Sequence, residues 1–317
     1  MTILKLMTLL QLKYIAKIVE CGSMNEASHE LYISQPALSS SVKELENELG
    51  IEIFTRHSQG IALTVEGAEF LTYAHQILDQ VDLMEQRYRQ TKPRKQLCRV
   101  STQHYMFAVE AFVEMITSSQ AEEYEFTIRE TRTRDIIDQV ASLRSEIGII
   151  YQSGFNGKII SKLLREKHLI FHPLFRCQPQ VFISRTNPLA DRSELTIEDL
   201  EPYPFLQYEQ GNEGSFYFAE EPVRPDYSPQ QITVSDRATM LNFIVGLNAY
   251  TVCTGIDNED LNTEKITTIP LRSDETMLLG WVNNERAKPS PAAQLYLGKL
   301  REVIVHHGYE LIDSSKL

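Results

Sequence analysis

The chain has 317 residues, of which 42% are hydrophobic and 23% are charged. At about 100–200 residues per domain, this length predicts about two or three domains. The composition is that of an ordinary globular protein, which excludes a disordered chain, a collagen-like chain and a disulfide-dense miniprotein. The net charge of −12 argues against a general nucleic-acid binder, because such proteins usually carry a basic excess.

No apolar run approaches the roughly 20 residues needed to cross a bilayer, so we expect no membrane association. Lys5, Lys13 and Lys17 interrupt the mildly apolar N-terminal stretch, and no small-residue cleavage site follows it. We interpret this stretch as an amphipathic helix rather than a signal peptide and expect a cytoplasmic protein. The four cysteines are scattered, which favours free thiols; a redox pair of Cys177 with Cys253 is the alternative.

The first part of the chain carries a compact series of helix signals. Apolar residues at helical spacing predict a helix over residues 9–20. Ser23 is followed three residues later by Glu26, as in a capping box, and this pattern predicts a short second helix over residues 24–32.

A third helix and a hairpin follow after a tight turn. Ser34 can cap the third helix, Pro36 is tolerated in its first turn, and Gly50 ends it. Two short apolar runs around a polar turn then predict a hairpin over residues 51–64. The order of elements is that of a winged helix-turn-helix module, which we assign to residues 1–64.

Residues 65–92 are predicted to form a long helix with a short linker at its end. Apolar residues recur there at alternating spacings of four and three, which is a heptad pattern. We interpret this pattern as a dimerisation seam; the alternative is a helix that lies against its own domain. The seam consists of Phe70, Ala74, Ile77, Val81, Met84 and Tyr88.

From residue 97 onward, strand-like runs alternate with helix-like runs. This alternation indicates βαβ units and a mostly parallel sheet. The strand-like runs lie at residues 98–102, 124–130, 146–151, 168–175, 180–184, 204–208, 231–235, 249–253 and 276–282. The helix-like runs lie at residues 104–118, 133–144, 196–200, 236–246 and 290–307.

Four separated motifs in the first 67 residues resemble the N-terminal domain of LysR-type transcriptional regulators. They are SQPALS at 34–39, LENELG at 45–50, IFTRH at 53–57 and LTVEG at 63–67. The later sequence resembles the effector domain of this family more diffusely, through EIGIIY at 146–151, NPLA at 187–190, IEDLEPYPFL at 197–206 and FIVGLNAYTV at 243–252. In the last motif, Asn248 and Ala249 stand where the family usually has a second glycine.

The resemblance implies a two-lobed α/β effector-binding domain, similar to periplasmic binding proteins, over residues 93–317. Lobe I is expected at residues 97–163 and 268–307, and lobe II at residues 164–267, with crossovers near 161–165 and 267–271. The resemblance also implies a sequence-specific regulator of transcription that binds double-stranded DNA and assembles as a homodimer or homotetramer.

The start of the third helix is the expected DNA-reading element, because a helix fits the major groove and its N-terminal side chains reach base edges. Glutamine can pair with adenine, serine can contact phosphate or base, and proline can contact a thymine methyl group. The alternative is an ordinary solvated helix face. The expected DNA contacts are Ser23, Asn25, Ser34, Gln35, Pro36, Ser39, Ser40, Lys43, Arg56 and His57, with Ser28 as a further phosphate donor.

Electrostatics oppose this assignment, because residues 1–65 carry five basic and seven acidic residues, a net charge of −2. We therefore expect the basic residues near DNA and Glu44, Glu46 and Glu48 mostly on other faces.

A small ligand is expected between the two lobes, because such clefts and strand ends are usual ligand sites. Free N–H groups at the first strand's end, with two hydroxyls, predict an anion seat, so a small anionic metabolite is the expected effector. The alternative for Thr102 and Ser235 is plain helix capping. The expected contacts are Ser101, Thr102, Gln103, Thr131, Arg132, Gln207, Tyr208 and Ser235.

No motif predicts an enzyme, and we expect no catalytic residue, metal site or cofactor. The sequence lacks G-x-S-x-G, P-loop and dinucleotide-binding glycine patterns. His168 and His172 have metal-ligand spacing only on a helix, and their segment reads as a strand. Two alternatives stay open: a cytoplasmic small-molecule carrier whose N-terminal module serves only oligomerisation, and a DNA-binding protein with a collapsed, empty cleft.

Overall fold

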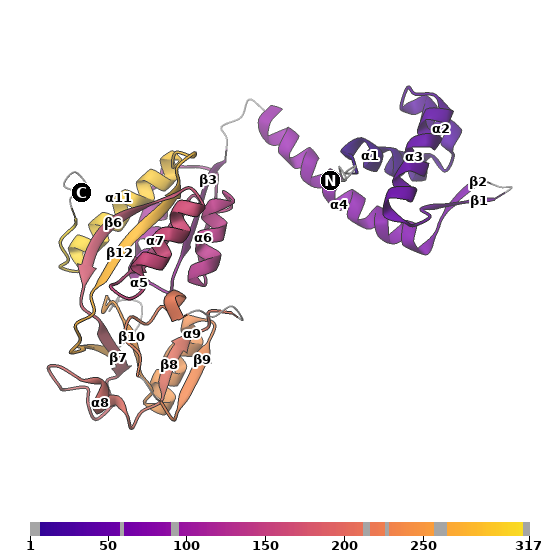
Figure 1. Ribbon diagram of the computed structural model, residues 1–317. Coiled ribbons are helices and arrows are strands. Elements are labelled where there is room, and N and C mark those ends of the chain that lie inside the picture. The colour runs from indigo at the N-terminus through magenta and orange to yellow at the C-terminus, as the bar shows by residue number, and fades with distance from the viewer. Residues whose placement is uncertain are drawn as a thin grey trace. The chain divides into compact units, whose positions relative to one another are not determined.

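The computed structural model describes residues 7–57, 60–89, 95–211, 216–225, 228–256 and 265–312 (Figure 1). Two compact units make up the chain, Met1–Arg94 and Lys95–Leu317. Each unit has its own hydrophobic core.

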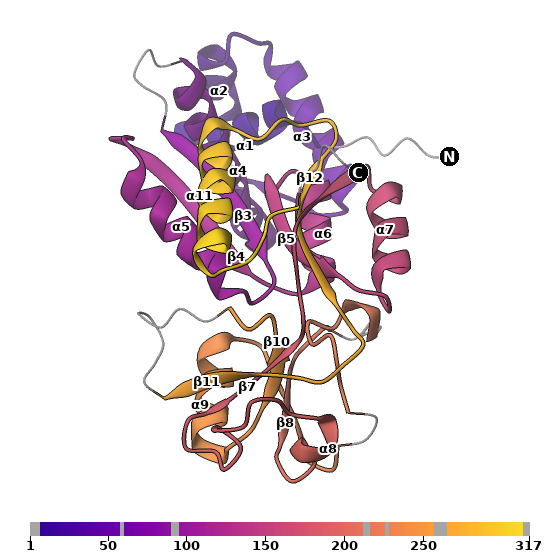
Figure 2. The same ribbon diagram turned by 90° about the vertical axis from the view of Figure 1, so that its left-hand side faces the viewer.

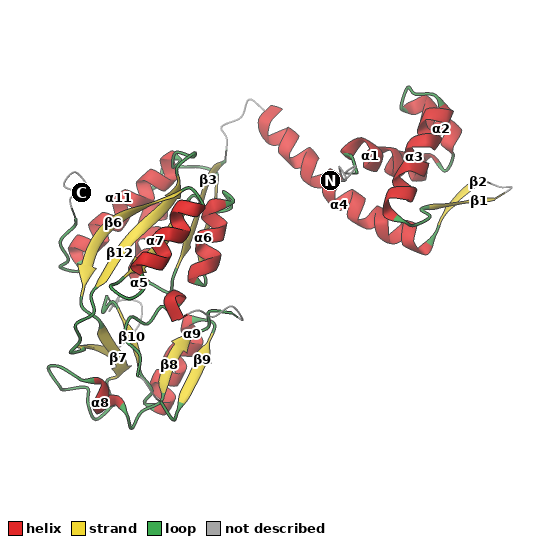
Figure 3. Cartoon of the chain, viewed as in Figure 1, coloured by secondary structure: helices red, strands yellow, loops and turns green. Residues whose placement is uncertain are grey.

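The first unit has the predicted order of elements, which confirms the winged helix-turn-helix fold (Figure 3). Serine or threonine caps the starts of the three short helices, and two of them end at glycines in the left-handed conformation. The second helix ends two residues earlier than predicted. The elements are α1 (Leu9–Cys21), α2 (Met24–Glu30), α3 (Gln35–Leu49), β1 (Phe54–His57), β2 (Gly60–Leu63) and α4 (Val65–Arg89).

A helix cap and a close backbone contact fix α4 on the hairpin of the first unit. Thr64 caps α4: its Oγ1 accepts a hydrogen bond from Gly67 N at 2.8 Å and donates to Glu52 O at 2.5 Å. A Cβ atom at Gly67 would lie 2.1 Å from Ile53 O, so only glycine permits this approach of helix and strand. The LTVEG motif therefore fixes the position of α4 on the hairpin.

Lobe I of the second unit is a sheet with the strand order β4-β3-β5-β12-β6. Strands β4 and β5 pair with β3 in parallel, whereas β12 runs antiparallel between β5 and β6. Helices α5 and α11 pack on one face and α6 and α7 on the other (Figure 2). The elements are β3 (Gln96–Thr102), α5 (Met106–Ser118), β4 (Tyr124–Glu130), α6 (Thr133–Ala141), β5 (Ile147–Gln152), α7 (Gly157–Glu166), β6 (Leu169–Cys177), β12 (Met277–Asn284) and α11 (Pro291–His306).

Lobe II contains an antiparallel sheet with the order β10-β7-β11 and a parallel pair, β8 with β9. A bridge between Phe205 and Tyr250 joins the two. The elements are β7 (Gln180–Ser184), α8 (Ile197–Leu200), β8 (Phe205–Tyr208), η1 (Phe216–Phe218), β9 (Gln231–Val234), α9 (Arg237–Leu247), β10 (Thr251–Cys253) and β11 (Ile266–Pro270).

The expected first crossover, near residues 161–165, is wrong, because β6 belongs to lobe I, whereas the return crossover lies close to its expected place at 267–271. The strand β6, expected in lobe II, pairs with β12 in lobe I, and the chain crosses only between Cys177 and Gln180. The strand β11, expected partly in lobe I, pairs with β7 in lobe II, and the return follows Pro270. Helix α7 was not predicted. A strand-like pattern does not reveal the sheet that the strand joins, because pairing is a tertiary interaction.

The turn between α9 and β10 forms with Asn248 and Ala249 in place of a glycine. Asn248 ends α9 at a φ of 51°, in the left-handed region that asparagine tolerates better than most residues. Ala249 is buried behind it. Within the described part of the chain, no helix is long and apolar enough to span a membrane.

Candidate functional site

The start of α3 displays its polar side chains outward. Ser34 caps the helix by accepting from Ala37 N at 3.4 Å, and the cap, Gln35 and Pro36 are all exposed. One turn further, Ser40 and Lys43 are exposed as well; Ser39 is half-buried. The opposite side of α3 carries Leu38, Val42 and Leu45 in the core. Short-range capping and the helical period thus orient this face.

Several acidic groups of the first unit are held within its own structure. Glu46 Oε1 accepts hydrogen bonds from Ile53 N at 2.7 Å and Phe54 N at 3.1 Å, which ties α3 to β1. Glu48 Oε1 accepts from Met7 N at 3.0 Å. The Nζ atom of Lys17 lies 2.7 Å from Glu20 and 3.1 Å from Glu30, and these carboxylates raise the pKa of Lys17 to about 12. Lys17 is therefore occupied, whereas Lys43 stands exposed on α3.

The start of α2 is less available to DNA than predicted. Ser23 is half-buried and its Oγ caps the helix by accepting from Glu26 N at 3.5 Å, whereas Asn25 is exposed. The structure does not support Ser28 as a phosphate donor. Its side chain is buried on the core side of α2, and its Oγ donates to Asn25 O at 2.7 Å.

Two other positions flank α3. The backbone of Arg56 and His57 ends β1 beside the hairpin turn, but their side chains lie outside the described residues. Tyr32, which the sequence did not single out, stands in the turn before α3 with 95% of its surface exposed and a φ of 56°. A tyrosine in a polar turn is the only sequence signal that marks it.

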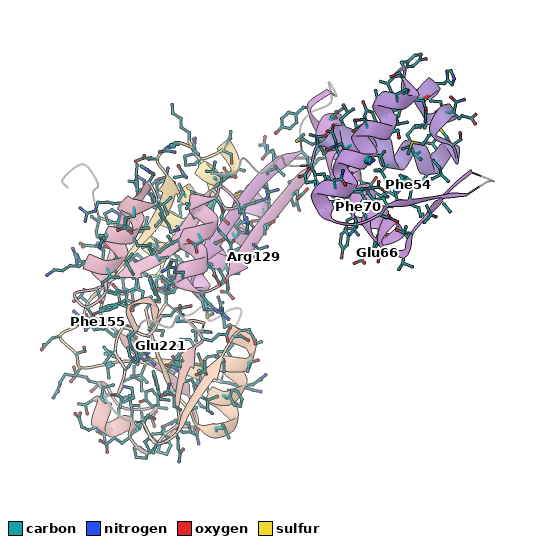
Figure 4. All side chains as sticks on the ribbon, turned by 45° about the vertical axis from the view of Figure 1, so that its right-hand side comes forward. Phe54, Glu66, Phe70, Arg129, Phe155 and Glu221 are labelled. Atoms are coloured by element: carbon teal, nitrogen blue, oxygen red, sulfur yellow. The ribbon has the colours of Figure 1, made fainter. Side chains whose placement is uncertain are left out.

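The predicted seam of α4 divides into two parts. Ala74 is only 1% exposed and Phe70 packs beside Phe54 against the core of its own unit (Figure 4). For these two residues the seam prediction is corrected: the alternative of a helix against its own domain applies, because α1 covers this end of α4. Ile77, Met84 and Tyr88 are exposed further along α4, with Val81 half-buried between them.

In the second unit, side chains at the end of β3 that were expected to bind an anion are hydrogen-bonded to other residues of the protein. Ser101 is 0% exposed and its Oγ lies 2.8 Å from Gln139 Oε1 and 2.6 Å from Ser145 Oγ, under the sheet. Gln103 donates to Thr133 Oγ1 at 2.6 Å and accepts from Tyr151 N at 3.0 Å. Both side chains are therefore buried and hydrogen-bonded within lobe I.

Thr102 and Ser235 do not cap the helices that follow them. Thr102 Oγ1 is buried without a hydrogen-bond partner among the described residues, and Tyr105 occupies the cap position of α5. Asp236 is the cap of α9, and Ser235 beside it is exposed. Thr131 is half-buried and its Oγ1 donates to Asp135 at 3.4 Å.

Three of the predicted contacts do gather at a polar cleft between the lobes, which we call the outer cleft. Arg132 of lobe I pairs there with Glu209 of lobe II, and Arg224 donates to Gln207. The third predicted contact is Tyr208, which is shared with a second cavity. The outer cleft has a volume of about 460 Å3.

A segment of lobe II, residues 216–221, packs against lobe I through its backbone and one carboxylate. Phe218 O accepts from Thr133 Oγ1 at 2.8 Å, and Ala219 O accepts from Tyr151 OH at 3.0 Å. Glu220 Oε2 accepts from His104 N at 2.9 Å, and the carboxylate also contacts His104 Nδ1 at 3.0 Å. The protein's own carboxylate thus lies at the start of α5, where a helix N-terminus favours negative charge.

Glu221, the next residue, is also buried at the junction of the lobes (Figure 4). Its Oε1 accepts from Tyr208 N at 2.8 Å. Burial, with a smaller effect of the neighbouring Glu220, raises the pKa of Glu221 to about 7. The Tyr208 ring stacks on His104 with 3.7 Å between the ring centroids.

These groups line what we call the inner cavity, which has a volume of about 50 Å3. Its polar walls are His104, Glu220, Glu221 and Arg237, and its apolar walls include Met106 and Phe182. The sequence did not predict this site, because residues 216–221 carry no motif that indicates docking on lobe I.

The two histidines considered as metal ligands each contact a different partner, and Cys177 and Cys253 are not joined by a disulfide bond. His168 Nδ1 lies 2.8 Å from Glu285, whereas His172 contacts Asn283 at 2.8 Å and stacks on Trp281. Burial raises the pKa of Cys177 to about 12, with a further contribution from Cys253, so its thiolate is scarce. Among the described residues, no group of three or more metal-ligating side chains gathers.

Comparisons with known proteins find a family model that matches each of the two units. A family model described as "Bacterial regulatory helix-turn-helix protein, lysR family" matches residues 9–68, and one described as "LysR substrate binding domain" matches residues 108–304. The chain is 29% identical over 211 residues to the regulator CysB of Haemophilus influenzae, which covers 64% of this chain and 62% of that protein.

A second curated relative and a solved structure are also similar to the chain. CysB of Burkholderia cenocepacia is 25% identical over 214 residues, covering 66% of this chain and 65% of that protein. A solved cysteine mutant of OxyR from Corynebacterium glutamicum has the same fold, with a TM-score of 0.52 and 18% identity over 95% of this chain and 92% of that one. The chain thus matches just under two thirds of the length of these curated relatives.

Proposed function

The chain belongs to the LysR family of bacterial regulators, and on this premise we propose that it is a sequence-specific DNA-binding transcription factor with a small-molecule effector. The observation that carries the proposal is the outward polar face at the start of α3, where Gln35, Ser40 and Lys43 are exposed. The carboxylates of Glu46 and Glu48 support it, because both accept backbone hydrogen bonds away from the start of α3.

The recognition face would enter the major groove of double-stranded DNA. Gln35 can read adenine through two hydrogen bonds, Pro36 can contact a thymine methyl group, and Lys43 can neutralise a phosphate. We add Tyr32 as a backbone contact, because its hydroxyl is exposed in the turn before α3. Ser34, Ser39 and Asn25 complete the interface, and Arg56 and His57 would extend it along the hairpin.

We propose that two copies of α4 form the dimer through its outer part. Ile77, Met84 and Tyr88 leave an exposed apolar stripe that a partner helix can bury. Two recognition faces would then bind two half-sites, and pairing of dimers would give a tetramer. Replacing Ile77 with Asp should shift the chain to monomers in sedimentation, whereas an unchanged dimer would exclude this seam.

The second unit would bind the effector between its lobes and pass the change in lobe packing to the DNA-bound modules. We place the protein in the cytoplasm, where it meets DNA, and assign it no catalytic activity.

A gel-shift titration of the full chain with DNA from upstream of its own gene tests the proposal. Gln35→Ala and Lys43→Ala should each weaken binding by about tenfold or more, since base and phosphate contacts are each worth about 1–3 kcal/mol. Lys13→Ala removes the same charge from the exposed side of α1 and is the matched control. Absence of any shift at low salt would instead favour a small-molecule carrier.

A further inference from the structure

The seat for an anionic ligand in the second unit is taken by the protein itself. Glu220 is 5% exposed, and its carboxylate accepts from His104 N at the start of α5. A second anion at this place would meet both Glu220 and Glu221, and two like charges in a site with little water repel strongly. The inner cavity therefore disfavours the anionic effector that the sequence predicts.

Glu221 and Arg237 both line this cavity with buried polar atoms that have no hydrogen-bond partner among the described residues, but only Arg237 of the two is in an ion pair, with Glu130. Glu221 is 3% exposed, and its Oε1 accepts one backbone hydrogen bond while Oε2 accepts none from the described residues. A buried carboxylate in this condition is unfavourable, because removal from water is not offset by hydrogen bonds or by an opposite charge. A donor that reached Oε2 would remove this penalty.

The cations near Glu221 are engaged elsewhere. His104 contacts Glu220, and Arg237, which lines the same cavity, pairs with Glu130. Arg224 donates to Gln207 in the outer cleft. Within the described ranges, Glu221 takes part in no ion pair, so no basic side chain of the protein is paired with it in the inner cavity.

The remaining walls of the cavity are largely apolar. Met106, Phe182, Met240 and Val252 are buried and line it. We propose that the inner cavity binds a small primary ammonium compound with a short apolar tail, whose nitrogen donates to Glu221 and whose tail packs on these walls. This inference rests on the proposed effector-binding role of the second unit and names the chemical class of its ligand.

Three probes of equal length and different charge test it: n-butylamine, n-butanol and butyrate. Binding to the full chain is measured by saturation-transfer NMR at millimolar concentration. The amine should bind about tenfold or more tighter than the alcohol, as expected for a charge-assisted hydrogen bond, and butyrate should not bind. Butyrate that binds as well as the amine, or three probes that all fail to bind, would overturn the proposal.

Glu221→Gln keeps the size of the side chain and removes its charge, so this variant should lose the preference for the amine. The matched control is Glu201→Gln, an exposed carboxylate of lobe II that does not line the cavity. Equal amine binding by Glu221→Gln and the parent chain would also overturn the proposal. The gel shift reports separately on the regulator: lost DNA binding with intact amine binding refutes only the proposed function.

Discussion

The polar groups at the start of α3 are exposed, whereas those at the junction of the two lobes are bonded to other parts of the protein. On α3, capping and helical period direct Gln35 and Lys43 outward, and the unit's own carboxylates are used inside its framework. At the lobe junction, the backbone N–H of His104 at the start of α5 donates to Glu220, a residue 116 positions away in the sequence. The polar groups of α3 are therefore exposed, whereas the junction of the lobes already contains a part of the protein.

The difference shows where function can be inferred from local sequence. A surface formed by one helix and its cap depends on contacts three or four residues apart. A cleft between two lobes depends on which distant segments meet there. Four predictions test how far this contrast holds, in decreasing order of expected effect.

Gly67→Ala should have the largest effect, because the new Cβ would lie 2.1 Å from Ile53 O and force α4 away from β1. We expect a loss of about 3 kcal/mol or more in the stability of the first unit, at the upper end of overpacking costs. Urea unfolding followed by circular dichroism measures it. The matched control is Gly246→Ala on α9, where a Cβ meets nothing within 4 Å. Equal stability of the two variants would contradict the tight contact.

Glu221→Gln should stabilise the second unit in a pH-dependent way. The pKa of Glu221 is raised from 4.5 to about 7, so its favourable neutral form is fully populated below pH 4.5 and is lost as the pH rises through 7. Glutamine should therefore add up to roughly 3 kcal/mol at pH 8 and little at pH 4.5, at about 1.4 kcal/mol for each unit of pKa shift. Thermal unfolding at both pH values measures this, and a gain that is independent of pH would show that the pKa of Glu221 is not raised in the folded protein.

Glu46→Ala should destabilise the first unit by about 2 kcal/mol, because the N–H groups of Ile53 and Phe54, at the start of β1, lose their acceptor. DNA affinity should fall with stability, although Glu46 itself does not face DNA. Glu52→Ala, at an exposed carboxylate next to the same strand, is the control. Higher DNA affinity in Glu46→Ala would instead indicate simple charge repulsion from the recognition face.

Tyr32→Phe should have the smallest effect, a loss of about two- to fivefold in DNA affinity with unchanged stability, since one exposed hydroxyl contributes about 0.5–1 kcal/mol. A gel-shift titration beside Tyr73→Phe, an exposed tyrosine of α4, measures it. If both variants bind DNA as the parent chain does, Tyr32 is not a contact.

Much of the fold was predictable because its signals are short-range. The caps Ser23 and Ser34 and the glycines Gly22 and Gly50 mark the ends of α1, α2 and α3 within two residues. The site at α3 followed from the same signals. The first crossover between the lobes did not, because β6 has the same alternating pattern whichever sheet it joins, and only its pairing with β12 assigns it to lobe I.

The contacts at the expected effector site were also not predictable from short-range signals. The pattern at the end of β3 predicted hydroxyls and free N–H groups, but Ser101 turns toward Gln139 and the N–H of His104 meets Glu220. The outer part of α4 illustrates an intermediate case: its heptad pattern was visible, whereas the burial of Ala74 against its own unit was not.

The amino-acid sequence by itself determined the family, the order of elements in the first unit and the residues that stand at the start of α3, because all three depend on motifs and contacts between near neighbours in the chain. Only the tertiary structure decided which lobe each strand joins and that Glu220 and Glu221 enter the junction of the lobes. The physical reason is that desolvation and hydrogen bonding of a buried group depend on everything packed around it, and that surrounding comes from segments far apart in the sequence.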